Sequence, residues 1–242
     1  MATGGVDVVG GNLVVLGGPE CLQCPLESLA GRNYCGRCGR RLRRSFEDKQ
    51  VSVLFVDVSG FTTLSERLNP EQVSEIMRRT FDILLGAVHE HGGTVNQLLG
   101  DGVIALFGER QSAHHARSAL SAALAVREDL ETLRHEVRRR YGLEFRVRMA
   151  INSGPVTLGT IGAALRTDHT ATGSTTSVAS RLLCSAEFGQ IVLSDRTRVL
   201  AAGRYGFQKL GEVSATGSSE RVSVYALISE AMDAESWRQV SV

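Results

Sequence analysis

Residues 51–62 read VSVLFVDVSGFT, an apolar stretch that carries one acid and then breaks at a glycine. The apolar run predicts a buried β-strand with Asp57 at its end. A carboxylate is costly to bury unless a positive charge or a metal ion neutralises it, so we expect Asp57 to have a functional role. The break at Ser59-Gly60 predicts a tight turn into a helix, which would place Phe61 and Thr62 at the helix start.

A second acid lies in the segment 96–107, which reads NQLLGDGVIALF. Two apolar runs, 94–99 and 103–107, predict a hairpin with Asp101 at its tip, although Gly-Asp-Gly is also ordinary turn chemistry. If the hairpin pairs with the strand 51–57, both carboxylates reach one edge and can hold two Mg²⁺ or Mn²⁺ ions, which prefer oxygen ligands. The backbone amides of Phe61 and Thr62 are then expected to face a phosphate group. Phosphoryl chemistry is the natural inference.

Length and charge set limits on the protein. The 242 residues can form one large domain with a small appendage. The formal net charge of +1 gives no overall argument for binding nucleic acid or an anionic membrane. No apolar run approaches the roughly 18 residues of a membrane span, and residues 1–19 lack the features of a signal peptide. We therefore expect a cytoplasmic protein without a membrane segment.

Two Cys-x-x-Cys pairs predict a structural zinc site near the N-terminus, because two such turns can close a tetrahedral thiolate shell. The four residues are Cys21, Cys24, Cys35 and Cys38. The alternative is a set of free cysteines in a loop. Four arginines follow within 40–44. They could contact nucleic acid, but the absence of interleaved aromatic residues favours a solvated linker.

The hydrophobic periodicity predicts alternating strands and helices. Asn69-Pro70 predicts the start of a helix that ends at Gly92-Gly93, and helical spacing returns over 112–140 and 177–186. Strands are predicted over 143–152 and 156–161, separated by Ser153-Gly154-Pro155, and over 191–193, 206–210 and 222–227. This order predicts an α+β, ferredoxin-like βαββαβ-type sandwich with its helices on one face of the sheet.

Four segments resemble the catalytic domain of the class III nucleotide cyclases in order and spacing over about residues 48–228. They read FVDVSGFTTLSERL, HGGTVNQLLGDGVIALFG, VRMAINSGPVTLGTIG and TATGSTTSVASRLL. The resemblance implies the class III cyclase fold and conversion of a nucleoside triphosphate, usually ATP, to the 3',5'-cyclic monophosphate and pyrophosphate. It also implies two divalent ions at a homodimer interface.

The resemblance assigns roles to particular residues. It implies that Asp57 and Asp101 are the metal ligands, with the Val58 carbonyl as a third. Arg148 falls where the family places a triphosphate-binding arginine on the metal-bearing subunit. Arg181 falls where an arginine of the opposite subunit stabilises charge on the transferring phosphate, a role that suits a planar, permanently charged group.

Four other positions concern the recognition of the nucleotide base and the turnover rate. Gln97 stands in place of the family's adenine-reading lysine, and Thr170 occupies the partner position, so ATP and GTP both remain open as substrates. Ser177 replaces an asparagine that orients the ribose, and Thr216 stands where a phosphate-binding lysine is expected. Each loss of a preorganised donor would cost about a hundredfold in turnover.

The sequence therefore predicts five regions. They are a flexible N-terminus (1–20), a zinc-ribbon-like segment (21–38), a basic linker (39–50), a cyclase-like catalytic domain (51–228) and a C-terminal tail (229–242). The leading hypothesis is an adenylate cyclase of low activity. The alternative is a non-catalytic, cyclase-like regulatory module that binds metal-nucleotide or only dimerises. The least favoured interpretation treats both acids as turn residues of an inert sandwich.

Overall fold

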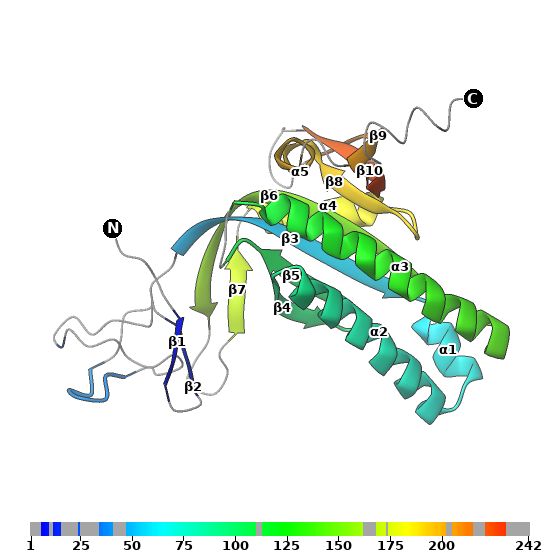
Figure 1. The fold of residues 1–242 in the computed structure, drawn as a ribbon, viewed down its shortest axis with the longest axis horizontal. Coiled ribbons are helices and arrows are strands. Elements are labelled where there is room, and N and C mark those ends of the chain that lie inside the picture. Colours follow the sequence, from blue (N-terminus) through cyan, green and yellow to red (C-terminus); the bar gives the residue numbers. More distant parts are fainter. Residues whose placement is uncertain are drawn as a thin grey trace. The chain divides into compact units, whose positions relative to one another are not determined.

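A computed structural model describes residues 6–9, 12–15, 24, 34–40, 47–109, 113–161, 168–172, 174–201, 205–214 and 221–230. Two compact units make up the chain (Figure 1). The first comprises Met1–Asp48 and Thr157–Ala171, and the second comprises Lys49–Val156 and Thr172–Val242. Asp57, Asp101 and Arg148 all belong to the second unit.

Most of the strands form one mixed sheet, and all of them except β7, the start of β3 and the end of β6 belong to the second unit. Seven strands are hydrogen-bonded in the order β4-β5-β3-β6-β8-β10-β9, and β7 pairs with β6. β5 is antiparallel to β3, and β8 runs parallel to β6. The strands are β3 (Glu47–Ser59), β4 (Gly93–Leu99), β5 (Gly102–Phe107), β6 (Arg146–Ile161), β7 (Asp168–Thr172), β8 (Ile191–Ser194), β9 (Tyr205–Ser214) and β10 (Arg221–Glu230).

Five helices accompany this sheet in the described part of the chain: α1 (Phe61–Arg67), α2 (Pro70–Glu90), α3 (His115–Tyr141), α4 (Ser174–Ser185) and α5 (Asp195–Leu200). The predicted start of α2 is confirmed. The Asn69 side chain accepts a hydrogen bond from the Gln72 backbone N–H (2.9 Å), and the Gln72 side chain accepts one from the Asn69 backbone N–H (3.2 Å). This reciprocal cap satisfies two amides that a helix start otherwise leaves without partners.

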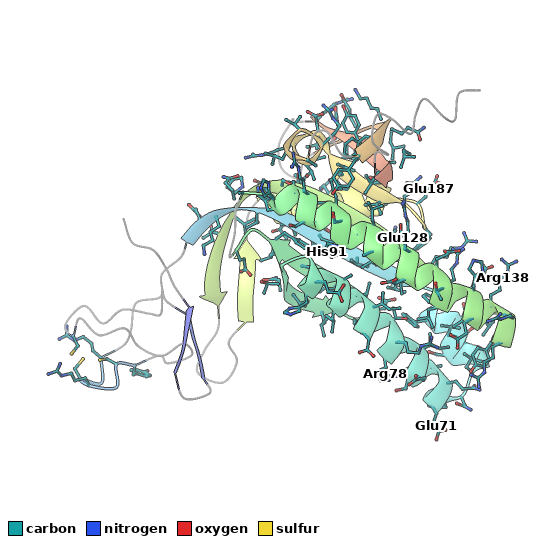
Figure 2. The ribbon with its side chains drawn as sticks, viewed as in Figure 1. Glu71, Arg78, His91, Glu128, Arg138 and Glu187 are labelled. Atoms are coloured by element: carbon teal, nitrogen blue, oxygen red, sulfur yellow. The ribbon has the colours of Figure 1, made fainter. Side chains whose placement is uncertain are left out.

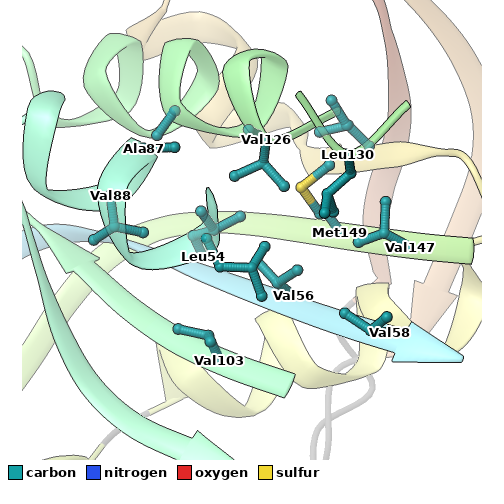
Figure 3. Close-up of a cluster of buried hydrophobic side chains, with 14 of the residues drawn as sticks. Leu54, Val56, Val58, Ala87, Val88, Val103, Val126, Leu130, Val147 and Met149 are labelled. Carbon is teal, nitrogen blue, oxygen red and sulfur yellow. The ribbon is translucent and has the colours of Figure 1, made fainter. Parts of the chain in front are cut away.

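The main core lies between the sheet and α1, α2 and α3. Figure 3 shows part of this core, with side chains of α2 and α3 above those of the sheet. Alternate residues of β3, namely Leu54, Val56 and Val58, face it, as strand geometry requires. Val126 and Leu130 of α3 pack from the helix side. Burial of these side chains is the main driving force that holds the helices on the sheet.

The expectation that all helices cover one face of the sheet is wrong, because α4 packs on the other face. Leu182 of α4 forms a separate buried cluster with Ala150, Val192 and Val224. Ala150 lies between Met149 and Ile151, which face the main core, so successive side chains of β6 are buried on opposite faces. The sheet is thus covered on both sides.

The predicted separation of two strands at Ser153-Gly154-Pro155 is also wrong, because β6 runs through these residues as one strand. Gly154 serves a close approach rather than a turn. A Cβ at Gly154 would overlap the hydroxyl oxygen of Thr175 in α4. Pro155 still takes part in the contact, since its carbonyl accepts a hydrogen bond from the Thr175 hydroxyl (2.7 Å).

Many charged residues of α2 and α3 lie at the surface. Glu71, Arg78, Glu128 and Arg138 are exposed (Figure 2). Arg78 pairs with neighbours on its own helix, and such exposed pairs contribute little to stability. These charges therefore keep one face of the helix pair solvated.

The first unit contains a short hairpin in which β1 (Val6–Val9) pairs antiparallel with β2 (Asn12–Val15). The prediction of a flexible segment over 1–20 did not include these strands. Arg41, Arg43, Arg44 and the tail from 231 onward lie outside the described residues. The predicted linker and tail therefore stay predictions.

Candidate active site

Asp57 and Asp101 lie at neighbouring ends of paired strands. Asp57 of β3 is opposite Gly102 of β5, so Asp101 immediately precedes the residue that pairs with Asp57. Both acids are partly buried. A side chain at Gly102 would come within 2.5 Å of the Val56 carbonyl oxygen, so a glycine is needed for the strands to pair here. The pairing brings the two carboxylates to one edge, as the sequence predicts.

Arg148 is the charged partner of Asp57. Its Nε donates a hydrogen bond to Oδ2 of Asp57 at 2.7 Å, and the two side chains are 27% and 28% exposed. Arg148 lies on β6, which is the neighbour of β3 in the sheet. This ion pair explains how a carboxylate can sit at the end of an otherwise apolar strand. It also joins a third predicted site residue, Arg148, to one of the two acids.

The turn after β3 is constrained by Gly60, which has φ 101° and caps α1. A Cβ at Gly60 would lie 2.8 Å from the Glu144 carbonyl oxygen, so a glycine is required on two grounds. Phe61 is only 7% exposed, and its ring stacks on Phe145 with centroids 5.9 Å apart. Phe61 can therefore serve a ligand only through its backbone. Thr62 is exposed.

Ser177 and Arg181 lie four residues apart on α4, and both are exposed. This spacing places them on one face of the helix. They line a groove of about 820 Å³, and Phe55 of β3 contributes to the same groove. The remaining lining residues are Thr176, Ser180, Cys184, Ser185, Val213 and Ser214. Neither carboxylate nor Arg148 belongs to this lining.

The structure describes only part of the group of residues predicted to recognise the base or bind phosphate. Gln97 is exposed on β4, beside an irregularity in the β4–β5 register. Thr170 lies on β7 in the other compact unit, and its side chain is outside the described residues. Thr216 also lies outside them. Of these three side chains, only that of Gln97 is described.

Three of the four predicted zinc ligands cluster in the first unit. The sulfur atoms of Cys24, Cys35 and Cys38 all lie within 4.8 Å of one another. The Cys35 carbonyl accepts a hydrogen bond from the Gly39 backbone N–H (2.9 Å), and Gly39 has φ 69°. This turn folds the second Cys-x-x-Cys pair back on itself. Cys21 lies outside the described residues.

A buried polar network was not predicted. The Ser52 hydroxyl lies 2.8 Å from Nδ1 of His115 and 2.6 Å from the hydroxyl of Ser153, which is 3.0 Å from that of Thr197. Burial, with a smaller contribution from the positive charge of Arg196, lowers the pKa of His115. The network joins β3, β6, α3 and α5. Periodicity cannot predict it, because these residues meet only in the folded chain.

Phe188 is another residue near the site that was not predicted from the sequence. It follows α4, and its ring lies against Arg148. A single aromatic residue in a loop carries no periodic signal, so nothing in the sequence distinguishes it.

The fold and the paired carboxylates match a known class of catalytic domain. The adenylate and guanylate cyclase catalytic domain family matches residues 44–229. The chain therefore belongs to this family, and its α+β architecture is the class III nucleotide cyclase fold. The predicted fold class is confirmed.

Two adenylate cyclases are among the relatives of this chain. Adenylate cyclase 1 of Rhizobium meliloti (strain 1021) is 35% identical over 184 residues, which are 74% of this chain and 28% of that protein. The adenylate cyclase of Anabaena cylindrica is 28% identical over 138 residues, covering 55% of this chain and 27% of that protein. This chain thus spans little more than a quarter of the length of either relative.

Two solved structures are similar over most of the chain. The adenylyl cyclase CyaB from P. aeruginosa superposes with a TM-score of 0.73 at 30% identity, covering 78% of this chain and 98% of that one. The guanylyl cyclase Cya2 gives a TM-score of 0.69 at 27% identity, with 78% and 96% covered. Of the helices that the structure describes, none has the length and apolar character needed to cross a bilayer.

Proposed function

We propose that this chain is an adenylate cyclase that converts ATP to 3',5'-cyclic AMP and pyrophosphate in a homodimer. The observation that carries the proposal is the arrangement of Asp57, Asp101 and Arg148 at adjoining strands, with two acids and one arginine together. Similarity to adenylate cyclases over three quarters of the chain supports ATP as the substrate. GTP is the alternative substrate, since Gln97 offers both a donor and an acceptor to a base.

The donor set suits two Mg²⁺ or Mn²⁺ ions. Asp57 and Asp101 supply carboxylate oxygens from the ends of paired strands, and the Val58 backbone carbonyl follows the first acid directly. Hard divalent cations prefer such oxygen ligands and retain positions for phosphate oxygens. The chemistry supplied by ions at this position is activation of the ribose 3'-hydroxyl and neutralisation of charge on the triphosphate.

The side chains around the acids would orient the nucleotide. In this proposal Arg148 binds the triphosphate, and the backbone amides of Phe61 and Thr62 donate hydrogen bonds to phosphate oxygens. Ser177 offers its hydroxyl to the ribose. Arg181 stabilises the charge that develops as the 3'-oxygen bonds to the α-phosphorus and the bond to pyrophosphate breaks.

The division of these residues between two places supports a homodimer. Ser177 and Arg181 line the groove beside α4, whereas the acids and Arg148 are outside its lining. A two-fold pair would bring the groove of one copy to the acids of the other and create two equivalent sites. Thr170 and Thr216 would complete the base and phosphate contacts.

Product analysis tests the proposal. The purified chain is incubated with ATP or GTP and either Mg²⁺ or Mn²⁺, and the nucleotides are separated by chromatography. We expect cyclic AMP from the wild type and none from Asp57→Asn. Asp129→Asn is the matched control, because Asp129 is an exposed acid on α3. Cyclic product from Asp57→Asn at the wild-type rate would refute the assignment.

A non-catalytic, cyclase-like module is the second candidate. The observation in its favour is that α4 presents Ser177, whose single short hydroxyl offers fewer contacts to the ribose than the family's asparagine. Calorimetry that detects metal-dependent nucleotide binding, with no turnover even after Ser177→Asn, would support this candidate over the enzyme.

We further propose that Cys21, Cys24, Cys35 and Cys38 bind one structural Zn²⁺. The three described sulfur atoms lie as close together as the ligands of a tetrahedral thiolate site do. Metal analysis should find about one zinc ion per chain, because four thiolates complete the shell of one Zn²⁺. Cys38→Ser should lower the zinc content, whereas Cys184→Ser on α4 should not. Such a site suits the reducing, cytoplasmic setting predicted from the sequence.

A further inference from the structure

The guanidinium of Arg148 is held on two sides. Nε donates to Oδ2 of Asp57 at 2.7 Å, and the Cζ atom lies 4.9 Å from the ring centroid of Phe188. Across the described residues, the terminal nitrogens Nη1 and Nη2 have no hydrogen-bond partner in the protein. The side chain is 27% exposed, so these two donors remain within reach of a ligand.

The loop that carries Phe188 is fastened to β6 on both sides of Arg148. The Gly189 N–H donates to the Val147 carbonyl (2.6 Å), and the Met149 N–H donates to the Gln190 carbonyl (3.0 Å). These two hydrogen bonds flank position 148. The Phe188 ring is therefore fixed beside Arg148, although Phe188 follows Arg148 by 40 residues in the chain.

The loop itself is a closed turn. The Gln190 N–H donates to the Glu187 carbonyl (3.0 Å), and the Glu187 N–H donates to the Gln190 side chain (3.1 Å). Gly189 has φ 95°, a conformation that favours glycine. Four hydrogen bonds and one glycine thus fix the backbone around Phe188.

Packing in the hydrophobic core does not explain the position of the Phe188 ring. Phe188 is 41% exposed and belongs to neither buried cluster of the second unit. An arginine within about 6 Å of a ring centroid is attracted to the face of the ring. Because Asp57 binds only Nε, an arginine without the ring would still sample several rotamers, and ordering it on ligand binding would cost free energy.

We propose that Phe188 is a positioning residue for Arg148. Its ring and the Asp57 carboxylate together hold the guanidinium so that Nη1 and Nη2 face the triphosphate of a nucleotide. This inference rests on the proposed function, because it deepens the role of Arg148 in binding that substrate. A side chain that acts through Arg148 should affect nucleotide affinity and KM more than kcat.

Three substitutions separate this role from simple packing. Phe188→Leu keeps the apolar volume but removes the ring, and Phe188→Tyr keeps the ring. Tyr225→Leu is the matched control, because Arg198 lies 4.9 Å from the Tyr225 ring, and Tyr225 packs against the main core on the face opposite α4. The measurements are the Kd of a non-hydrolysable ATP analogue with Mg²⁺ by calorimetry, KM and kcat, and Tm.

We expect Phe188→Leu to weaken nucleotide binding about threefold to fivefold, the range of a partly exposed cation–π contact. KM should rise by a similar factor, with kcat and Tm nearly unchanged. Phe188→Tyr should bind nucleotide as the wild type does. In an Arg148→Met background the Phe188→Leu change should have no further effect, because the partner of the ring is gone.

Three results would overturn the inference. Nucleotide binding by Phe188→Leu that equals the wild type would show that the ring does not position Arg148. A loss that persists undiminished in Arg148→Met would show that the ring acts elsewhere, and a wild type that binds no nucleotide would refute both the inference and the function. Binding without cyclic product would refute only the function, since the calorimetric series does not depend on turnover.

Discussion

Gly154→Ala should destabilise the protein through one defined contact. The added Cβ would overlap the hydroxyl oxygen of Thr175 and approach its Cγ2 to 3.3 Å. The first turn of α4 cannot move freely, because the Thr175 hydroxyl donates to the Pro155 carbonyl (2.7 Å) and its own carbonyl accepts from Asn152 (2.9 Å). Relief of the overlap must therefore strain at least one of these hydrogen bonds.

The magnitude follows from this geometry. Overpacking a tight interior contact costs about 1–3 kcal/mol, so we take about 2 kcal/mol as the expected loss. For a chain of this size the fall in Tm is about 4–8 °C. Because Ser177 and Arg181 lie on α4, kcat of the proposed reaction should fall as well.

Thermal unfolding and product formation provide the assay. Gly86→Ala in α2 is the matched control, because no atom lies within 4 Å of its added Cβ, and the change should stabilise the helix by about 0.5–1 kcal/mol. Thr175→Ala removes the overlapped atoms, so the double variant Gly154→Ala/Thr175→Ala should lose less stability than the two single variants combined. A wild-type Tm for Gly154→Ala, or strict additivity in the double variant, would refute the reasoning.

Three further predictions concern the site, a buried histidine and the helix pair. Mixing inactive Asp57→Asn with inactive Arg181→Ala should restore about one quarter of wild-type activity, because half of the random dimers carry one intact site; no recovery would argue against a shared site. The pKa of His115 is lowered by burial, so the unfolded chain binds more protons, and stability should fall as the pH drops below the unfolded pKa of 6.5; His115→Gln should flatten the dependence of Tm on pH between 7.5 and 5.5. Arg79→Ala removes an ion pair to Glu136 (2.8 Å) whose side chains are 39% and 37% exposed; Tm should fall only slightly, and less so at high salt.

Local patterns were sufficient for most elements of the fold. The Asn69-Pro70 signal predicted α2 because the cap is formed by residues three apart in sequence. The hairpin that carries Asp101 was predicted because glycines flank its tip. The segment 195–200 was not predicted as helical, although Ser194 caps α5 through the Thr197 N–H (3.3 Å). A helix of six residues gives too short a period to detect.

Two errors share one physical cause. Ser153-Gly154-Pro155 has turn composition, and turn composition is a local property. The glycine is needed because α4 packs against the strand on the second face of the sheet, which is a contact between distant segments. The same contact places helices on both faces of the sheet. Neither the position of α4 nor the continuity of β6 could therefore be predicted without knowledge of this contact.

The sequence alone determined the two acids, their place at strand ends and the family motifs, because each of these depends on residues close together in the chain. It also predicted that Cys24, Cys35 and Cys38 lie close together, as their sulfur atoms do. Only the tertiary structure decided which groups meet across the sheet. Arg148 reaches Asp57 because β6 is the neighbour of β3, and Phe188 reaches Arg148 because its loop is hydrogen-bonded to β6. Such contacts depend on strand order, and no local pattern of residues encodes strand order.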